Sequence, residues 1–360
     1  MKLKYSTLLI AFFISFCGVS QEMKKGFTYL ETGKFKQAET FFETVLQTYP
    51  SNKTARLCYG RAVGLNGNSK QAVNLFAALL DDFPTDFEVK LNYAEALLWN
   101  KNYTSAKDYY QNLLKENDTS FPALLGYANT LSNLKEFGNA IVYVDKALTV
   151  LPKNKNALIS KKYMRLGLAN DEMNLQDYLE AETILKENFE DFKEDKETLL
   201  NLANLYLISN QIDKAKEIYT VIGGSPANQL ISLNGIALAE HLKSNDKEAL
   251  VVSKKAFDSL TEQTEGSLKN QTTERYIQAL IWNKKYSLAA KEIDVLMIKN
   301  KDPENWILAL RATLNIYKSD FKKSISDYNL ILKNDSTSFD GNLGKANALK
   351  ATGYYDAAYE

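Results

Sequence analysis

Few residues in this chain of 360 are of the types that carry catalysis or bind metal ions. His241 is the only histidine, so no histidine cluster can hold a metal, and a serine–histidine–aspartate triad would have to use that one side chain. Its neighbours Leu242 and Lys243 complete no nucleophile or metal motif. We therefore expect His241 to be an ordinary residue on a helix face.

No other motif of enzymes is present. The glycines of VIGGSPAN, residues 221–228, lack the lysine and hydroxyl residue of a phosphate-binding loop, so we expect a turn there. The chain has no Cys-x-x-Cys and no His-Glu-x-x-His. Its carboxylates lie in mixed-charge runs such as EDFKEDKE, residues 190–197, which are typical of solvated helix ends. We expect no enzyme, no metal and no cofactor.

The composition narrows the class of protein further. Lysine plus arginine and aspartate plus glutamate both number 44, so no basic excess exists to bind nucleic acid. A content of 45% hydrophobic and 24% charged residues is typical neither of a disordered chain nor of an integral helical membrane protein. With only 16 glycines and 6 prolines, the chain should be mostly helical.

The first twenty residues, MKLKYSTLLIAFFISFCGVS, have the pattern of a secretory signal peptide. Lys2 and Lys4 precede an apolar run, residues 8–19, that is too short to span a membrane comfortably. The small residues Gly18 and Ser20 predict cleavage before Gln21. The sequence therefore predicts an exported protein.

The two cysteines leave a second interpretation of the leader open. Lipidation at Cys17 would make the chain a lipoprotein, although the bulky Phe16 before it fits that signal poorly. If the leader is cleaved, only Cys58 remains and no disulfide can form within the chain. Leu57 and Tyr59 beside it favour a buried thiol over a reactive one.

An internal repeat organises the rest of the chain. Four alanines are each 34 residues apart: Ala38, Ala72, Ala106 and Ala140. Small residues twelve positions earlier keep the same spacing: Gly26, Gly60, Ala94 and Ala128. Large apolar residues follow each alanine by four positions: Phe42, Phe76, Tyr110 and Val144. Prolines close three of the four repeats: Pro50, Pro84 and Pro152.

This pattern resembles the tetratricopeptide repeat (TPR) family, whose period is 34 residues and whose unit is a helix–turn–helix. The two small positions would let the helices approach closely, and the large residue would fill the space beside them. A single pair cannot bury its apolar face, so neighbouring pairs must stack. The resemblance implies an all-α, right-handed superhelical solenoid.

About ten repeats are expected. Residues 21–152 hold the first four, and residues 153–195 an irregular fifth with about seven extra residues. Lys162 stands where that repeat should have a small residue, so we expect a looser joint there. Residues 196–360 hold repeats six to ten, with extra length in a polar loop at 258–271. Glu360 follows Ala358 closely, so the tenth repeat is incomplete and a longer protein is expected.

In the TPR family, partners usually lie in a concave groove lined by the first helix of each repeat. Carrying that over predicts these binding residues: Arg61, Glu95, Trp99, Asn129, Asn204, Gln278, Trp282 and Asn347. The same face includes Leu65, Asn133, Ile208, Thr313 and Tyr317.

Trp99 and Trp282 hold the same position in their repeats and could anchor a peptide or a sugar ring. The alternative is that both pack at a helix end against a neighbouring repeat. The asparagines resemble the ladder by which some TPR proteins hold a peptide backbone, but they are not in adjacent repeats. The lysines of the chaperone-type carboxylate clamp are absent, since leucines stand there: Leu125, Leu200 and Leu343.

We interpret the chain as an exported scaffold that binds other proteins in a bacterial envelope. Residues 97–114, LLWNKNYTSAKDYYQNLL, are similar to periplasmic TPR regions of outer-membrane exopolysaccharide exporters. That resemblance implies partners among proteins, with polysaccharide as a further ligand and outer-membrane association through a region beyond residue 360. The alternative is an array that presents substrates to, or regulates, a catalytic domain downstream. A free-standing assembly adaptor is a third possibility.

Overall fold

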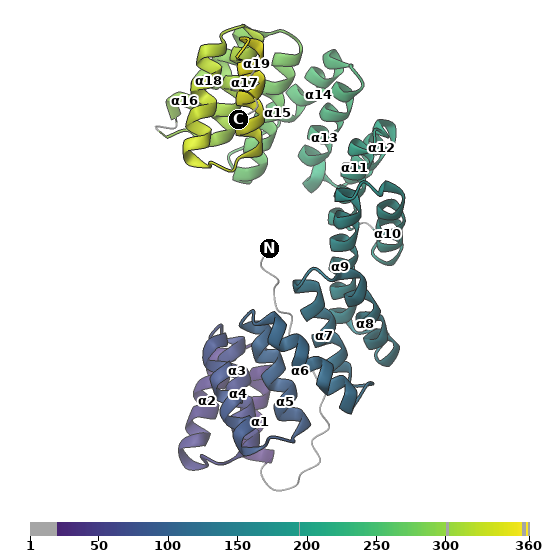
Figure 1. Ribbon diagram of the computed structural model, residues 1–360, viewed down its shortest axis with the longest axis vertical. Coiled ribbons are helices and arrows are strands. Elements are labelled where there is room, and N and C mark those ends of the chain that lie inside the picture. Colours follow the sequence, from purple (N-terminus) through teal and green to yellow (C-terminus); the bar gives the residue numbers. More distant parts are fainter. Residues whose placement is uncertain (1–19, 194, 300–301, 355–357, 359–360) are drawn as a thin grey trace. The chain divides into compact units, whose positions relative to one another are not determined.

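The computed structural model describes residues 20–193, 195–299, 302–354 and 358. Within these ranges the chain forms 19 α-helices and one short 3-10 helix, and no strand. This confirms the all-α prediction (Figure 1). Cys17 and the rest of the predicted signal peptide up to residue 19 lie outside the described residues, as does most of the second helix of the tenth repeat.

The chain divides into two compact units, residues 1–192 and 193–360, which we describe separately. The helices of the N-terminal unit are α1 (Ser20–Glu31), α2 (Phe35–Thr48), α3 (Lys53–Leu65), α4 (Ser69–Asp82), α5 (Phe87–Trp99), α6 (Tyr103–Glu116), α7 (Phe121–Asn133), α8 (Phe137–Val150), α9 (Lys155–Asn174) and α10 (Tyr178–Asp191).

The C-terminal unit continues the same alternation of first and second helices. Its elements are α11 (Lys196–Ile208), α12 (Ile212–Ile222), the 3-10 helix η1 (Pro226–Asn228), α13 (Gln229–Leu242), α14 (Asp246–Asp258), α15 (Gly266–Trp282), α16 (Tyr286–Lys299), α17 (Asn305–Tyr317), α18 (Phe321–Asn334) and α19 (Phe339–Ala351). The segment 221–228 ends α12 and forms η1, as expected of a turn.

Within each unit, every helix packs against the helices before and after it in the chain (Figure 1). The first helices of neighbouring pairs also contact one another, as α3 does α5 and α15 does α17. No two second helices of the described residues make a comparable contact. The first helices therefore form the inner layer of each stack, and we call their free side the inner face.

The turn inside each helix pair has one residue in the left-handed region, five positions before the repeat alanine or its equivalent. Glycine holds that position three times, at Gly33, Gly67 and Gly353. In the other seven turns it is Lys101, Lys135, Gln176, Asn210, Ser244, Lys284 or Ser319, with φ between 57° and 64°. A left-handed residue is the usual way to end an α-helix, because it lets backbone N–H groups reach the last carbonyls.

The repeat positions found in the sequence are the contact points of the core. The alanines of the second helices, from Ala38 to Ala289, have no exposed surface, and neither has Ser324 at the ninth such position. Phe42, Phe76 and Tyr110 are buried beside them. Cys58 is buried in the same layer as Met23 and Phe42, which confirms the expected buried thiol.

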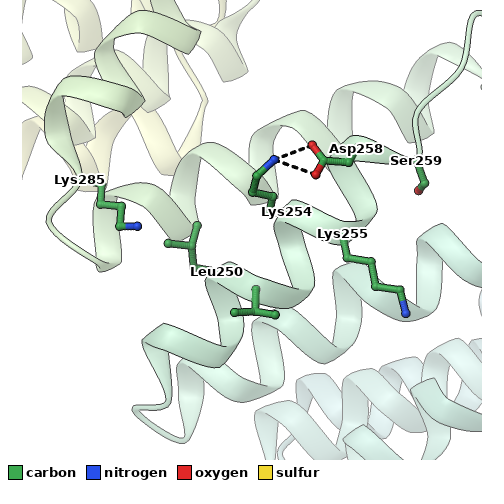
Figure 2. Close-up of a pocket in the computed structure, with 7 residues that line it drawn as sticks. Leu250, Lys254, Lys255, Asp258, Ser259 and Lys285 are labelled. Carbon is green, nitrogen blue, oxygen red and sulfur yellow. Dashed lines mark hydrogen bonds and ion pairs between the residues drawn. The ribbon is translucent and has the colours of Figure 1, made fainter.

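The surface of the described residues is indented by hollows that include the following two. One, of about 630 Å³, lies along α1 and α2 beside Tyr29 and Phe41. The other, of about 620 Å³, runs along α14, and we call it the α14 groove (Figure 2). Its lining residues are Leu250, Val251, Lys254, Lys255, Asp258, Ser259 and Lys285.

The extra residues of the fifth repeat lengthen its first helix. α9 has 20 residues, whereas α7 has 13, so the insertion adds about two turns and no loop. Because of this shift, the small residue twelve positions before Ala181 is Ala169, which is fully buried. The expectation that Lys162 would occupy the close-packed position was wrong. It placed the small residue by its distance from the start of the repeat, whereas the structure keeps its distance from Ala181.

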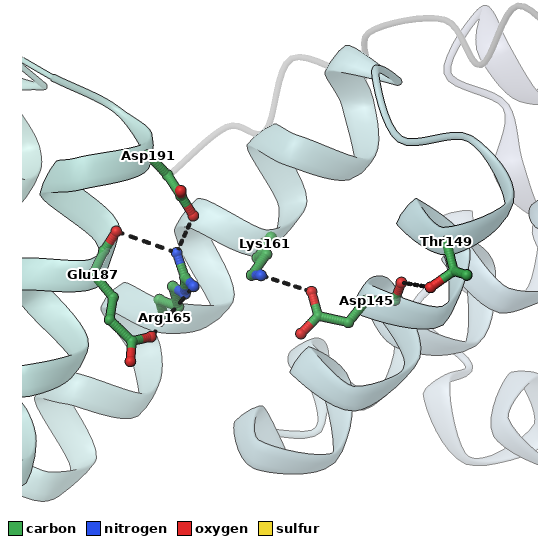
Figure 3. A network of polar contacts seen from close by, with 6 residues as sticks. All are labelled: Asp145, Thr149, Lys161, Arg165, Glu187 and Asp191. Atoms are coloured by element: carbon green, nitrogen blue, oxygen red, sulfur yellow. Dashed lines mark hydrogen bonds and ion pairs between the residues drawn. The ribbon is translucent and has the colours of Figure 1, made fainter.

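A network of ion pairs holds α9 to both of its neighbours (Figure 3). Arg165, whose side chain is only 11% exposed, donates to Asp191 at 2.5 Å and to Glu187 at 3.3 Å, both on α10. Lys161 reaches back to Asp145 on α8 at 2.7 Å. Since Arg165 and Lys161 are one helical turn apart, the same face of α9 is tied in both directions.

The second insertion is only partly a loop. The prediction of a polar loop at 258–271 holds for residues 259–265, but α15 already begins at Gly266. Glu265 starts the helix early, because its carboxylate accepts hydrogen bonds from the backbone N–H groups of Ser267 and Leu268. Within the described residues, no helix is both long and apolar enough to span a membrane.

Candidate functional site

The residues predicted for binding all lie on first helices, but they are distributed over both units. Four belong to the N-terminal unit: Arg61 on α3, Glu95 and Trp99 on α5, and Asn129 on α7. Four belong to the C-terminal unit: Asn204 on α11, Gln278 and Trp282 on α15, and Asn347 on α19.

Arg61 and Glu95, one repeat apart, bind each other. The Arg61 guanidinium donates to Glu95 Oε2 at 3.3 Å and to Asn92 Oδ1 at 2.9 Å. Both charged side chains are about one-fifth exposed. Asn92 in turn donates to the backbone carbonyl of Glu88 at 2.7 Å. Because these groups bind one another, they tie α3 to α5.

Trp99 is partly buried and packs against the preceding helix pair. A Cβ atom at Gly64 would lie 2.3 Å from Trp99 Cζ3, so the indole lies directly on the backbone of α3. This is the packing that the sequence left open as an alternative to ligand binding. In the N-terminal unit the tryptophan therefore has a structural contact at the inner face.

Trp282 meets the preceding pair in a different way. Its ring stacks on His241 of α13, with centroids 3.6 Å apart and planes 2° from parallel. The imidazole is held by a 2.6 Å contact between its Nδ1 and Asp246 Oδ1. His241 is thus more than an ordinary residue on a helix face. A signal for this was present, since Gly64 and His241 both stand eight positions before their repeat alanines.

Beside this stack, apolar side chains occupy one repeated position of the C-terminal unit, three of them exposed and Trp282 half-buried. We call Ile208, Leu242, Trp282 and Tyr317 the apolar row, and each stands seven positions before the small buried residue of its second helix. Ile208 is 47% exposed, Leu242 48% and Tyr317 52%. Leu242 was missing from the sequence prediction, although the spacing that selected Trp282 and Tyr317 would have found it.

A polar cluster lies next to Trp282 on α15. The Arg275 guanidinium donates to Gln278 Oε1 at 2.8 Å, and Gln278 donates to Glu274 Oε1 at 3.1 Å. The guanidinium carbon is 5.9 Å from the Trp282 ring, within the range of a cation–π contact. Gln278, predicted from the sequence, is therefore the centre of this cluster.

Burial shifts the titration of both charged members of the polar cluster. It raises the pKa of Glu274, an effect that Arg275 opposes and Asp340 reinforces. It also lowers the pKa of Arg275 below its ordinary value. Arg275 Nε is buried and has no hydrogen-bond partner among the described residues. The cluster therefore contains a buried donor whose hydrogen-bonding capacity is unused among the described residues.

The three asparagines predicted as a ladder do not form one. Asn204 and Asn347 are exposed in the C-terminal unit, and Asn129 is half-buried in the N-terminal unit. Their side-chain amides make no hydrogen bond with the described part of the chain. Within that same part, no group of three or more histidine, cysteine, aspartate or glutamate side chains could hold a metal ion.

Comparison with known families agrees with the repeat pattern in part of the chain. Models of the tetratricopeptide repeat match residues 22–52 and residues 65–122. The chain therefore contains tetratricopeptide repeats in these two stretches, which cover the first pairs of the N-terminal unit. No curated protein matches the sequence.

Several solved structures resemble the chain at low sequence identity. A tetratricopeptide repeat protein from Parabacteroides merdae has 20% identity and a TM-score of 0.44, covering 70% of this chain and 98% of its own. The Cut9–Hcn1 hetero-tetramer of the APC/C has 16% identity and a TM-score of 0.41, covering 93% of this chain and 57% of its own. The MamA protein has 20% identity and a TM-score of 0.36, covering 47% and 89%.

Proposed function

We propose that the chain is a non-catalytic scaffold that binds a segment of a partner protein along the apolar row of its C-terminal unit. The observation that carries this proposal is the recurrence of an apolar side chain at the same position of four successive first helices, exposed in three of them and half-buried at Trp282. Scattered exposed apolar residues are ordinary on protein surfaces, but a series aligned on one face marks an interaction site.

The neighbouring groups suit a peptide. Trp282 is held flat by His241, so it offers a rigid aromatic surface that loses little entropy on binding. The polar cluster beside it offers donors and an amide that a peptide backbone could use. A partner would therefore place apolar side chains on the row and its backbone near Gln278.

The test is to isolate a partner with the intact chain and then measure its direct binding to purified variants. Leu242→Glu adds a charge to the row at an exposed site, so folding should survive. We expect binding to weaken at least about tenfold, because the new carboxylate would be buried unpaired in an apolar interface. The matched control is Leu179→Glu, at a leucine of the N-terminal unit that is 77% exposed. Unchanged binding by Leu242→Glu would refute the proposal.

We also propose that the protein acts outside the cytoplasm, in a bacterial envelope. The support is the basic and apolar pattern of residues 1–20. Mass spectrometry of the mature protein tests this: a chain that begins at Gln21 is expected. A diacylated Cys17 would establish a lipoprotein instead, and an uncleaved Met1 in the cytosolic fraction would contradict export.

A role in polysaccharide export at the outer membrane is the more specific form of this proposal. It is supported only by the similarity of residues 97–114 to the repeats of such exporters. Deleting the gene should then reduce secreted polysaccharide, and the single change Leu242→Glu should reproduce that loss. Normal secretion in the deletion strain would exclude this role while leaving the scaffold proposal standing.

A further inference from the structure

The α14 groove is lined by none of the residues of the apolar row. It consists of lysine side chains around an apolar floor. Leu250 is half-buried and Val251 is 62% exposed, and together they form the floor. Lys255, from α14, and Lys285, from the turn before α16, are exposed on the rim. Figure 2 shows Lys285 reaching toward Leu250 from that turn.

The equivalent place in the N-terminal unit is closed by an ion pair. Lys107, one position after the repeat alanine of α6, binds Glu136 in the turn of the following pair at 2.6 Å. The residues at these two positions of the α14 groove are Leu250 and Lys285. A leucine cannot form an ion pair with a lysine, so the junction between these two helix pairs has no ion pair at these positions.

The charges of the groove are unequally compensated. Lys254 is occupied by Asp258, with both carboxylate oxygens 2.7 Å from its ammonium group (Figure 2). Lys255 and Lys285 form no ion pair with the described residues. The groove therefore has two unpaired positive charges on either side of an apolar floor.

We propose that the α14 groove binds an acidic segment of a partner protein, with an apolar side chain on Leu250 and Val251 and carboxylates on Lys255 and Lys285. The apolar floor between the lysines favours a peptide over a nucleic acid, which has phosphates but no aliphatic side chains. The chain as a whole has no net positive charge to attract the extended phosphate backbone of a nucleic acid. This surface is separate from the apolar row, so the inference goes beyond the proposed function.

A phage-displayed library of random twelve-residue peptides, selected on the immobilised full chain, tests the proposal. The chain used for selection should have Trp282→Ala, so that the apolar row does not dominate. We expect enriched sequences in which acidic residues flank an apolar one. Enrichment of basic or uncharged sequences, or no enrichment, would overturn the proposal.

Synthetic versions of the enriched peptides then locate the binding surface. Replacing Lys255 and Lys285 by glutamine should weaken binding roughly threefold to thirtyfold, the range expected for two exposed ion pairs. The matched control is Lys247→Gln, an exposed lysine of α14 outside the groove, which should have no effect. Peptides that bind the double variant as well as the original chain would refute the assignment.

One substitution should act in the opposite direction. Asp258→Asn removes the carboxylate that occupies Lys254, so a third lysine becomes available and acidic peptides should bind more tightly. Binding should also weaken as salt is added, because exposed charge pairs are screened. If single-stranded oligothymidylate competes with the peptides for the groove, the occupant is a nucleic acid and the proposal is wrong.

Discussion

The phenol ring of Tyr110 lies against the backbone of Gly126, so closely that a Cβ atom at residue 126 would be 2.3 Å from Tyr110 Cζ. The same contact recurs twice, between Tyr219 and Gly235 and between Tyr328 and Gly344. Each tyrosine is on a second helix, and each glycine is on the first helix of the next pair. Three junctions between helix pairs thus depend on a ring that fills the space of a missing side chain.

This contact predicts that Gly126→Ala destabilises the protein. The added methyl group must displace the buried Tyr110 ring, so we expect the free energy of unfolding to fall by about 1–3 kcal/mol. The matched control is Gly138→Ala on α8, where a Cβ atom would meet nothing within 4 Å. Since alanine favours helix, that variant should unfold at the same denaturant concentration or slightly higher. Equal destabilisation by both changes would contradict the contact.

A second prediction concerns the ion pairs of the long helix α9. Arg165→Ala removes a nearly buried guanidinium that joins Asp191 and Glu187, so thermal and denaturant unfolding should show a loss of about 1–3 kcal/mol. Lys254→Ala breaks an exposed pair with Asp258 within α14 and should cost less than about 0.5 kcal/mol. A reversed order would show that burial does not set the strength of these pairs.

A third prediction follows from the thiol of Cys58. Burial raises its pKa from 9.0 to about 12. Above pH 9 the unfolded thiol loses its proton while the folded one keeps it, so this contribution to stability is complete below pH 9 and is lost as pH rises. Between pH 8 and pH 10 the original chain should lose about 1 kcal/mol more stability than Cys58→Ala.

Alkylation offers an independent check on Cys58. Iodoacetamide reacts with thiolates, so the native chain should be modified very slowly at pH 8 and quickly in denaturant. Rapid modification of the native protein would show that the thiol is accessible. Parallel pH dependence in the original chain and in Cys58→Ala would remove the thiol as a cause.

A fourth prediction concerns the left-handed turns. Lys101, Lys135 and Lys284 have φ near 60°, a conformation that costs about 1–2 kcal/mol for a residue with a Cβ atom. Glycine adopts it without that cost but gains freedom in the unfolded chain. We therefore expect each Lys→Gly change to stabilise by up to about 1 kcal/mol, measured by denaturant unfolding. Lys101→Pro should do the reverse, since proline cannot adopt a positive φ.

The helix pairs could be predicted from the sequence because their signals are local and repeated. The repeat alanines, from Ala38 to Ala289, mark the positions where two helices pack closely, and all of them are buried. Cys58 was also correctly expected to be buried. The insertion in the fifth repeat was misinterpreted because spacing alone cannot tell whether extra residues lengthen a helix or a loop. Ala169 settles that point only once α9 is seen to continue through it.

The candidate site was less accessible to such reasoning. Repeat phase placed Trp99 and Trp282 on the inner face, yet their contacts differ because the opposing residue is glycine in one case and His241 in the other. The opposing residue belongs to the preceding repeat, so the positions within a single repeat do not reveal it. The unsatisfied Nε of Arg275 likewise depends on burial by surrounding helices.

The turns described above also bear on how such a chain can change in length. Each helix pair contains its own left-handed residue, five positions before the repeat alanine or serine of its second helix. A stretch of coding sequence for one pair therefore specifies a complete turn wherever it is inserted. Duplication or loss of a 34-residue segment would create no new type of turn. An array of this kind can therefore gain or lose whole helix pairs while the turns of the remaining pairs stay unchanged.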